Sequence, residues 1–88
     1  MSKTIYRHEY DVLLTLIKKH RKESGLTQVA CSKALGRPQS FMSDVETGSR
    51  RLDIVQLRDL CNVLGVDFQI LISEFETSLS ARVGAAGR

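Results

Sequence analysis

The sequence predicts an all-α fold, a compact domain of five helices, and three observations support this. Apolar residues recur at three- and four-residue spacing along most of the chain. Glycines follow these periodic stretches where helices would end, and the turn dipeptides and sustained alternation typical of β-hairpins are missing. We expect the domain to span 1–79, with dimerisation through the fifth helix. The small residues of 80–88 predict a flexible C-terminal tail.

The first two helices are expected at about 8–23 and 27–35. Gly25 closes the first, and basic residues crowd its last turns, where the helix dipole favours positive charge. Thr27 is the expected N-cap of the second helix, which stops at Gly36.

The other three helices have clear start signals as well. Pro38 is expected to open the third helix, which ends at Gly48. Asp53 and Gln56 have the spacing of a capping box at the start of the fourth, which ends at Gly65. Asp67 caps the fifth. Its broad apolar face consists of Phe68, Leu71, Ile72, Phe75 and Leu79.

Composition excludes several classes of protein. No uninterrupted apolar run exceeds three residues, which argues against a membrane span or a secretory segment and predicts a cytoplasmic protein. Cys31 and Cys61 occupy apolar helical positions, so we interpret them as reduced core residues. No nucleophile–histidine set, metal-ligand cluster or glycine-rich phosphate loop is present, so we expect no enzymatic activity, no metal and no cofactor.

Charge is unevenly distributed along the chain. The net charge is +3 over the whole chain, but residues 1–52 carry ten Lys and Arg against five Asp and Glu, whereas residues 53–79 carry one against five. The basic half suggests a surface for a polyanion, and the acidic segment a different surface.

The segment from Gly25 to Gly48 favours DNA binding. Two short helices separated by Gly36-Arg37-Pro38 form a helix-turn-helix, whose second helix protrudes and fits the major groove of B-DNA. The polar residues of that helix share one face: Gln39, Ser40, Ser43, Asp44 and Thr47. The amide of Gln39 can pair with adenine through two hydrogen bonds.

These residues resemble the lambda-repressor/Cro-type helix-turn-helix regulators, also called the XRE family. The resemblance rests on G-L-T-Q at 25–28, L-G-R-P-Q-S-F-M-S-D-V-E-T-G at 35–48 and L-x-D-L-x-x-x-L-G-V at 57–66. It covers about residues 10–76 and implies a transcriptional regulator that binds double-stranded DNA.

The resemblance also implies roles for individual residues. Base-facing positions correspond to Pro38, Gln39, Ser40 and Asp44, and phosphate-contacting positions correspond to Gln28, Thr47, Ser49, Arg50 and Arg51. We also expect Ser43, on the same polar face, to read a base and Arg37 to contact phosphate. Arg21 and Glu46 match a buried ion pair between the first helix and the recognition helix. Two exposed charges that never meet are the alternative for that pair.

Two residues have more than one possible role, and a third departs from the family pattern. Phe41 either packs beneath the third helix or contacts a thymine methyl group as a base reader. Asp44 either accepts a hydrogen bond from cytosine or discriminates against wrong sequences. Ser32 stands where family members often have Ala, and its hydroxyl can bond back to a helix carbonyl.

A single recognition helix makes few base contacts, so we expect a homodimer on a palindromic operator. Its interface is expected on the fifth helix, at Ile70, Ile72, Phe75 and Leu79; an entirely intramolecular role for this face is the alternative. Such a dimer would act as a repressor or controller protein by occupying its operator. The competing interpretation is an antitoxin-like module that neutralises a second, unknown protein and binds DNA secondarily.

Overall fold

The computed structural model describes residues 7–87, and the side chains of residues 7–80. Within this range the chain is all-helical, as predicted. The elements are α1 (His8–Glu23), α2 (Gln28–Ala34), α3 (Phe41–Thr47), α4 (Ile54–Leu64) and α5 (Phe68–Gly87).

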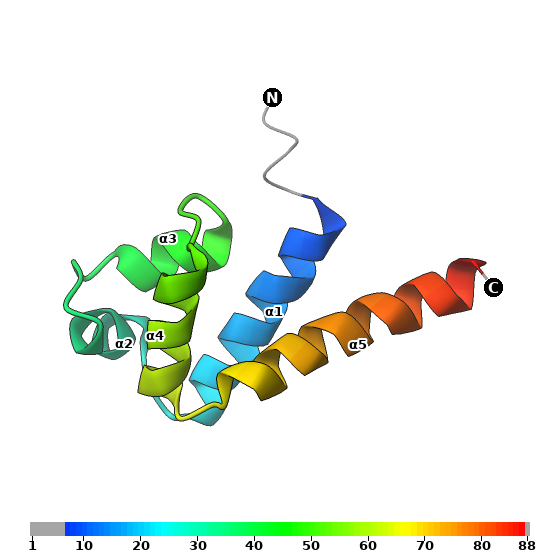
Figure 1. Ribbon diagram of the computed structural model, residues 1–88. Helices are drawn as coiled ribbons and strands as arrows, with labels where there is room; N and C mark the ends of the chain where they lie inside the picture. The colour runs from blue at the N-terminus through cyan, green and yellow to red at the C-terminus, as the bar shows by residue number, and fades with distance from the viewer. Residues whose placement is uncertain (1–6, 88) are drawn as a thin grey trace.

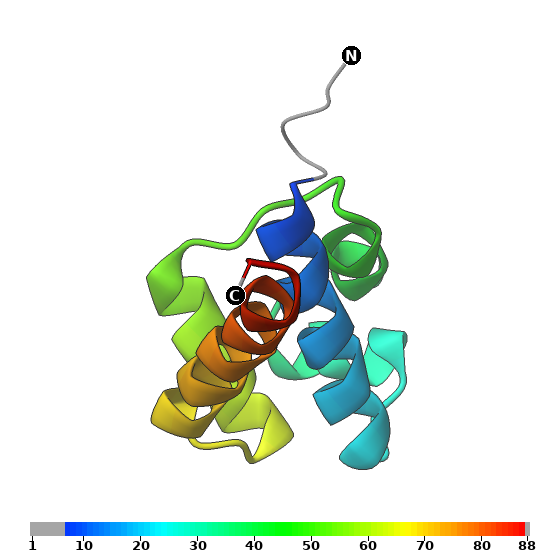
Figure 2. The ribbon, with the colours of Figure 1, turned by 90° about the vertical axis from the view of Figure 1, so that its right-hand side faces the viewer.

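Helix α1 lies at the centre of the fold and packs against both α3 and α5, while α2 packs against α3 and α4 (Figure 1). Helix α5 starts beneath this body, and its later turns extend away from it (Figures 1 and 2). The four shorter helices and the first turns of α5 enclose one core. Its most buried residues are Ile17, Cys31, Met42, Val45, Leu60, Cys61 and Leu71.

Three helix starts follow the capping signals in the sequence. Thr27 accepts a hydrogen bond from the amide of Ala30, 3.0 Å away. Asp53 and Gln56 form the complete capping box, with bonds of 2.8 and 2.9 Å. Asp67 accepts from the amides of Gln69 and Ile70. These side chains satisfy amides that a helix start leaves without intrahelical partners.

The start of the third helix was predicted wrongly. Helix α3 begins at Phe41 rather than Pro38, because Pro38, Gln39 and Ser40 form a turn in which the Phe41 amide bonds the Pro38 carbonyl at 2.9 Å. That i+3 bond closes one turn, whereas α-helical i+4 bonding begins with the Asp44 amide on the Ser40 carbonyl. Proline suits the start of a turn as well as the start of a helix.

The end of the fifth helix also differs from the predicted tail. Helix α5 continues through Gly87 instead of ending near residue 79. Alanines at 81, 85 and 86 have the highest helix propensity of any residue type, and extending an existing helix avoids the cost of a new nucleus.

A buried ion pair fixes α3 against α1. The Arg21 guanidinium donates from Nε to Glu46 Oε2 at 2.6 Å and from Nη2 to Oε1 at 3.2 Å, with the two side chains only 9% and 3% exposed. Gln28 donates to the same carboxylate at 3.0 Å, and Arg21 Nη1 reaches the Leu26 carbonyl at 2.8 Å. The bond to Glu46 raises the pKa of Arg21. One carboxylate therefore receives donors from both α1 and α2.

Two further contacts join the helices. Ser32 is fully buried on α2, where its hydroxyl donates to the Gln28 carbonyl, as expected, and also accepts from the amide of Met42 on α3, both at 2.9 Å. His20 on α1 lies with Nε2 2.5 Å from a carboxylate oxygen of Glu74 on α5. Side chains with hydrogen-bonding groups thus link α2 to α3 and α1 to α5.

The two cysteines are core residues, as predicted. Both are free and buried, and burial raises the pKa of each thiol, which disfavours the reactive thiolate. None of the helices within the part of the chain that the structure describes is both long and apolar enough to cross a membrane.

Replacing Glu46 by Ala should destabilise the protein by about 3–5 kcal/mol, because Arg21 would keep a buried charge without its partner. A thermal melt would show this as a large drop in Tm. Glu9→Ala is the matched control, because the Arg7–Glu9 pair is solvent-exposed and its loss should leave the melt unchanged. Superimposable melts of Glu46→Ala and the parent protein would contradict the importance of the buried pair.

Candidate nucleic-acid interface

Most of the polar residues predicted to read bases are exposed, in the turn before α3 or on its first turn. Gln39 and Ser40 lie in the turn that precedes the helix, and Asp44 follows on its first turn; all three are exposed. Ser43 is half-buried. The opposite side of α3 holds Met42 and Val45, both fully buried. The helix therefore presents short hydrogen-bonding side chains outward from a fixed apolar base.

Hydrogen bonds to one acceptor, the carbonyl oxygen of Asp44, hold the loop after α3 in place. The Asp44 carbonyl oxygen accepts from the Arg50 amide at 3.0 Å, from the Thr47 hydroxyl at 3.2 Å and from the Ser49 hydroxyl at 3.4 Å. The two hydroxyls also lie 2.9 Å from each other. Gly48 adopts the left-handed conformation, with φ of 87°, that ends α3 and turns the chain back. The loop is thereby fixed to the helix that it follows.

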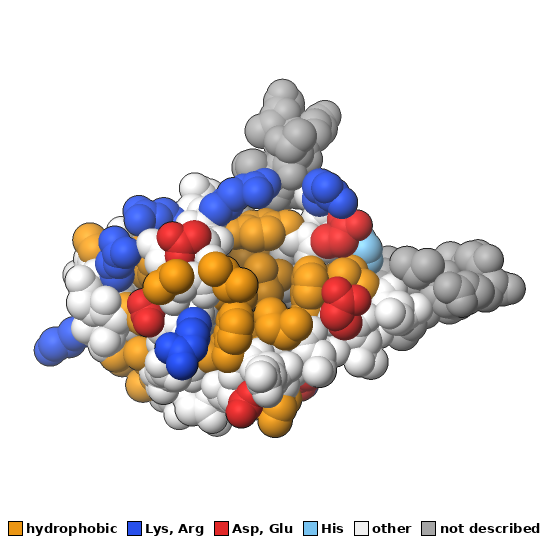
Figure 3. Space-filling model, in the orientation of Figure 1, with side chains coloured by type: hydrophobic (Ala, Val, Ile, Leu, Met, Phe, Trp, Pro, Cys, Tyr) orange, Lys and Arg blue, Asp and Glu red, His pale blue; other side chains and the backbone are white. Residues whose placement is uncertain are grey.

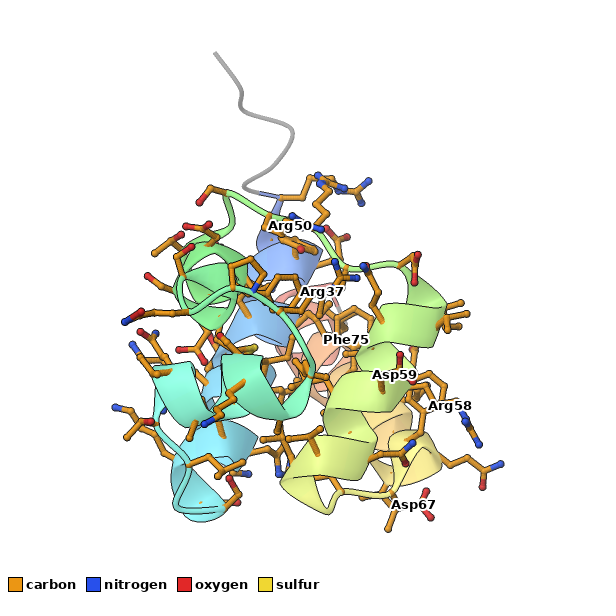
Figure 4. The ribbon with its side chains drawn as sticks, turned by 90° about the vertical axis from the view of Figure 1, so that its left-hand side faces the viewer. Arg37, Arg50, Arg58, Asp59, Asp67 and Phe75 are labelled. Carbon is orange, nitrogen blue, oxygen red and sulfur yellow. The ribbon has the colours of Figure 1, made fainter. Side chains whose placement is uncertain are left out.

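Each of three arginines that flank α3 in the sequence lies close to an aromatic ring. The guanidinium carbons of Arg37 and Arg50 both lie 5.2 Å from the centre of the Phe41 ring. That of Arg51 lies 4.9 Å from the Tyr10 ring of α1. Figure 4 shows Arg37 and Arg50 near each other, whereas Arg58 on α4 points away from both. Several Lys and Arg side chains lie along the upper left edge of the molecule in Figure 3, where Figure 1 shows α3.

Phe41 had two possible roles, and its position favours the first. Its side chain is only 5% exposed and belongs to the core cluster. A ring so covered offers little surface for a thymine methyl group. Its contacts with Arg37 and Arg50 could not be predicted from helical periodicity, because both arginines lie in segments outside α3.

Gln28 is half-buried at the start of α2. One hydrogen of its amide group bonds Glu46. Because a primary amide has two donors, the second hydrogen stays available to a phosphate oxygen. Gln28 can therefore link the buried ion pair to the surface.

The four residues predicted for the dimer interface do not share one face of α5. Ile72, Phe75 and Leu79 follow one another at helical spacing and are each half-buried. Ile70 is 57% exposed and lies about 200° around the helix from Ile72, beside Leu16 and Lys19 of α1. Phe75 borders a surface hollow together with Tyr10, Leu13 and Arg51. Hydrophobic side chains gather where α4 and α5 approach each other (Figure 3).

Comparisons with known proteins agree with this arrangement. A family model described as a helix-turn-helix domain matches residues 13–75. The structure is similar to that of an XRE-family like protein from Pseudomonas syringae pv. tomato str. DC3000, with a TM-score of 0.78 and 40% sequence identity. The similarity covers 88% of this chain and 94% of that protein. Comparison with curated proteins found no match.

The family match spans more than half of the chain, and the similar structure is covered almost completely. XRE-type helix-turn-helix domains are non-enzymatic DNA-binding domains. The chain therefore belongs to the XRE family of helix-turn-helix proteins, and it carries the DNA-binding domain of that family.

Proposed function

We propose that this protein is a transcriptional regulator that binds a palindromic operator as a homodimer and acts by occupying it as a repressor or controller protein. The observation that carries the proposal is the exposure of Gln39, Ser40 and Asp44, which Arg37 and Arg50 flank in the sequence. Short side chains with donors and acceptors suit base edges, and arginines suit phosphates. Selection of bound duplexes from a random pool tests this directly, since a regulator of this kind recovers a palindrome.

Each of these residues has its own role in this proposal. Gln39 and Ser40 enter the major groove first, because they precede α3 at its exposed end, and Asp44 and Ser43 follow along the helix. Contacts to phosphate come from Gln28, Arg37, Thr47, Ser49, Arg50 and Arg51. The Asp44 side chain is exposed, and a cytosine amino group is the donor that best suits its carboxylate.

The proposed dimer uses the face of α5 that carries Ile72, Phe75 and Leu79. Leu71 already covers the core from this helix at 2% exposure, and neither Ile72 nor Leu79 belongs to the core cluster. Their apolar surface continues into the hollow lined by Tyr10 and Leu13. A second copy related by a two-fold axis would cover this surface and set two recognition helices about 34 Å apart along the duplex.

Gln39→Ala should weaken binding to the selected operator by about 1–3 kcal/mol and relax the preference at one base pair of each half-site. The loss of two hydrogen bonds to a base is the reason. Titrations with the selected duplex and with its single-base variants measure both effects. Gln69→Ala on α5 is the control, with no change expected. Equal losses on the operator and on random DNA would show that another residue reads this base.

Arg50→Ala should weaken binding to all duplexes by about the same factor. It should also flatten the dependence of log K on log salt by about one unit for each protomer, because one phosphate contact is lost. Arg58→Ala removes the same charge from a position that points away from this surface and should leave the slope nearly unchanged. Identical slopes for the two variants would contradict a phosphate contact by Arg50.

Leu79→Glu should dissociate the dimer, since a carboxylate would be buried in an apolar interface. Sedimentation would then give the mass of one 9.9 kDa chain, where the parent protein gives twice that mass. Ile70→Glu is the matched control on the other side of α5 and should remain dimeric. Dissociation by Ile70→Glu alone would place the interface on the opposite face, and a parent protein with the mass of one chain at every concentration would exclude the dimer.

A further inference from the structure

Two arginines from different loops meet a single aromatic ring. Arg37 belongs to the connection between α2 and α3, and Arg50 to the loop between α3 and α4. Both side chains are exposed, yet each guanidinium carbon lies 5.2 Å from the centre of the buried Phe41 ring. This distance is within the range of cation–π attraction. The ring is therefore the common neighbour of two cations that approach it from different segments of the chain.

The backbones of both arginines are also fixed. The Arg37 amide bonds the Ser32 carbonyl at 2.9 Å, and the Arg50 amide bonds the Asp44 carbonyl at 3.0 Å. An arginine side chain nevertheless has several rotatable bonds, and ordering it on binding costs conformational entropy. Contact with a buried ring restrains the far end of each side chain before any ligand arrives. The entropy cost at the time of binding is reduced accordingly.

The ring contact leaves the arginines able to bind an anion. A guanidinium group has five N–H donors in its own plane, so those directed away from the ring stay available to a ligand. The two like charges held near one ring repel each other in the free protein. A phosphate oxygen placed against their N–H groups would offset this repulsion, whereas a neutral base edge would not.

We propose that Phe41 is a positioning residue that holds Arg37 and Arg50 in place for the phosphate backbone and reads no base itself. This inference rests on the DNA-binding function proposed above. It assigns Phe41 a role that burial alone does not require, because a purely aliphatic side chain could fill the same part of the core. Its effect falls on both arginines together, so the connection before α3 and the loop after it are prepared as one phosphate-binding unit.

Site-specific replacement of Phe41 by mono-, di- and trifluorophenylalanine in the full chain tests the proposal. Fluorine withdraws electron density from the ring face and weakens cation–π attraction, while the shape of the side chain changes little. Affinity for DNA should fall with each added fluorine. The total loss should be about two- to fivefold for each arginine that the ring no longer holds. The fall should be equal for the selected operator and for a random duplex of the same length, because phosphates are common to both. The same series at Phe68, on α5 and away from α3, is the control and should show no trend.

Phe41→Leu and Phe41→Tyr provide a second measurement, with thermal melts recorded in parallel. Phe41→Tyr retains an aromatic ring and should preserve affinity, whereas Phe41→Leu should lose it on both duplexes. In the Phe41→Leu background, Arg37→Ala should cost less affinity than in the parent protein, since the arginine is no longer held in place. Each cost of Arg37→Ala is measured between two proteins with the same residue at position 41, so the effect of the Phe41→Leu change on stability cancels.

The outcomes separate this inference from the proposed function. Affinity that is independent of fluorine number, with normal binding by the unmodified protein, would overturn the role of Phe41 and leave DNA binding intact. A loss confined to the operator, with a relaxed preference for thymine at one position, would show that Phe41 reads a base. Failure of the unmodified protein to bind either duplex would overturn both proposals.

Discussion

The carboxylate of Glu46 is the point on which the recognition surface depends. Helix α3 has seven residues, which is too short to be stable alone, so contacts with the rest of the protein must determine its position. Glu46 receives Arg21 from α1 and Gln28 from α2 in an almost fully covered site. A buried ion pair is costly to desolvate and adds little stability compared with apolar packing. We interpret its value here as orientation, since a displaced α3 would break the bonds that Glu46 accepts from both Arg21 and Gln28.

The orientation of α3 then fixes both segments that flank it. Ser32 holds the first turn of α3 through the Met42 amide, and the Asp44 carbonyl gathers the loop that follows. The Ala that family members often carry in place of Ser32 would leave that amide without this partner. These bonds are short-range, so a displacement of α3 would shift the turn, the helix and the loop together. Base-reading and phosphate-contacting side chains consequently keep one register relative to each other.

Local signals predicted most of the fold, because they depend on a few neighbouring residues. The capping box at Asp53 and the cap at Asp67 are examples, as both are formed by side chains and amides within three positions. Pro38 misled the prediction because its preferred φ suits a turn and a helix start equally well. The ring contacts of Phe41 could not be predicted, since they depend on how the loop at Arg50 folds back over α3. The separation of Ile70 from Ile72, by contrast, follows from helical periodicity, which places residues two apart on different sides of a helix.

The arrangement separates two energetic tasks that share one scaffold. In the proposed function, specificity belongs to the turn at Gln39 and to the outer side of α3, where Gln39, Ser40 and Asp44 are exposed. Affinity would come from the two flanking segments, whose arginines we propose are restrained by Phe41. Because the ring lies on α3 itself, these phosphate contacts would be built on the same element that enters the groove. Backbone contacts made in this way favour the insertion depth at which Gln39 meets a base edge, and thus general attraction to DNA supports the reading of its sequence.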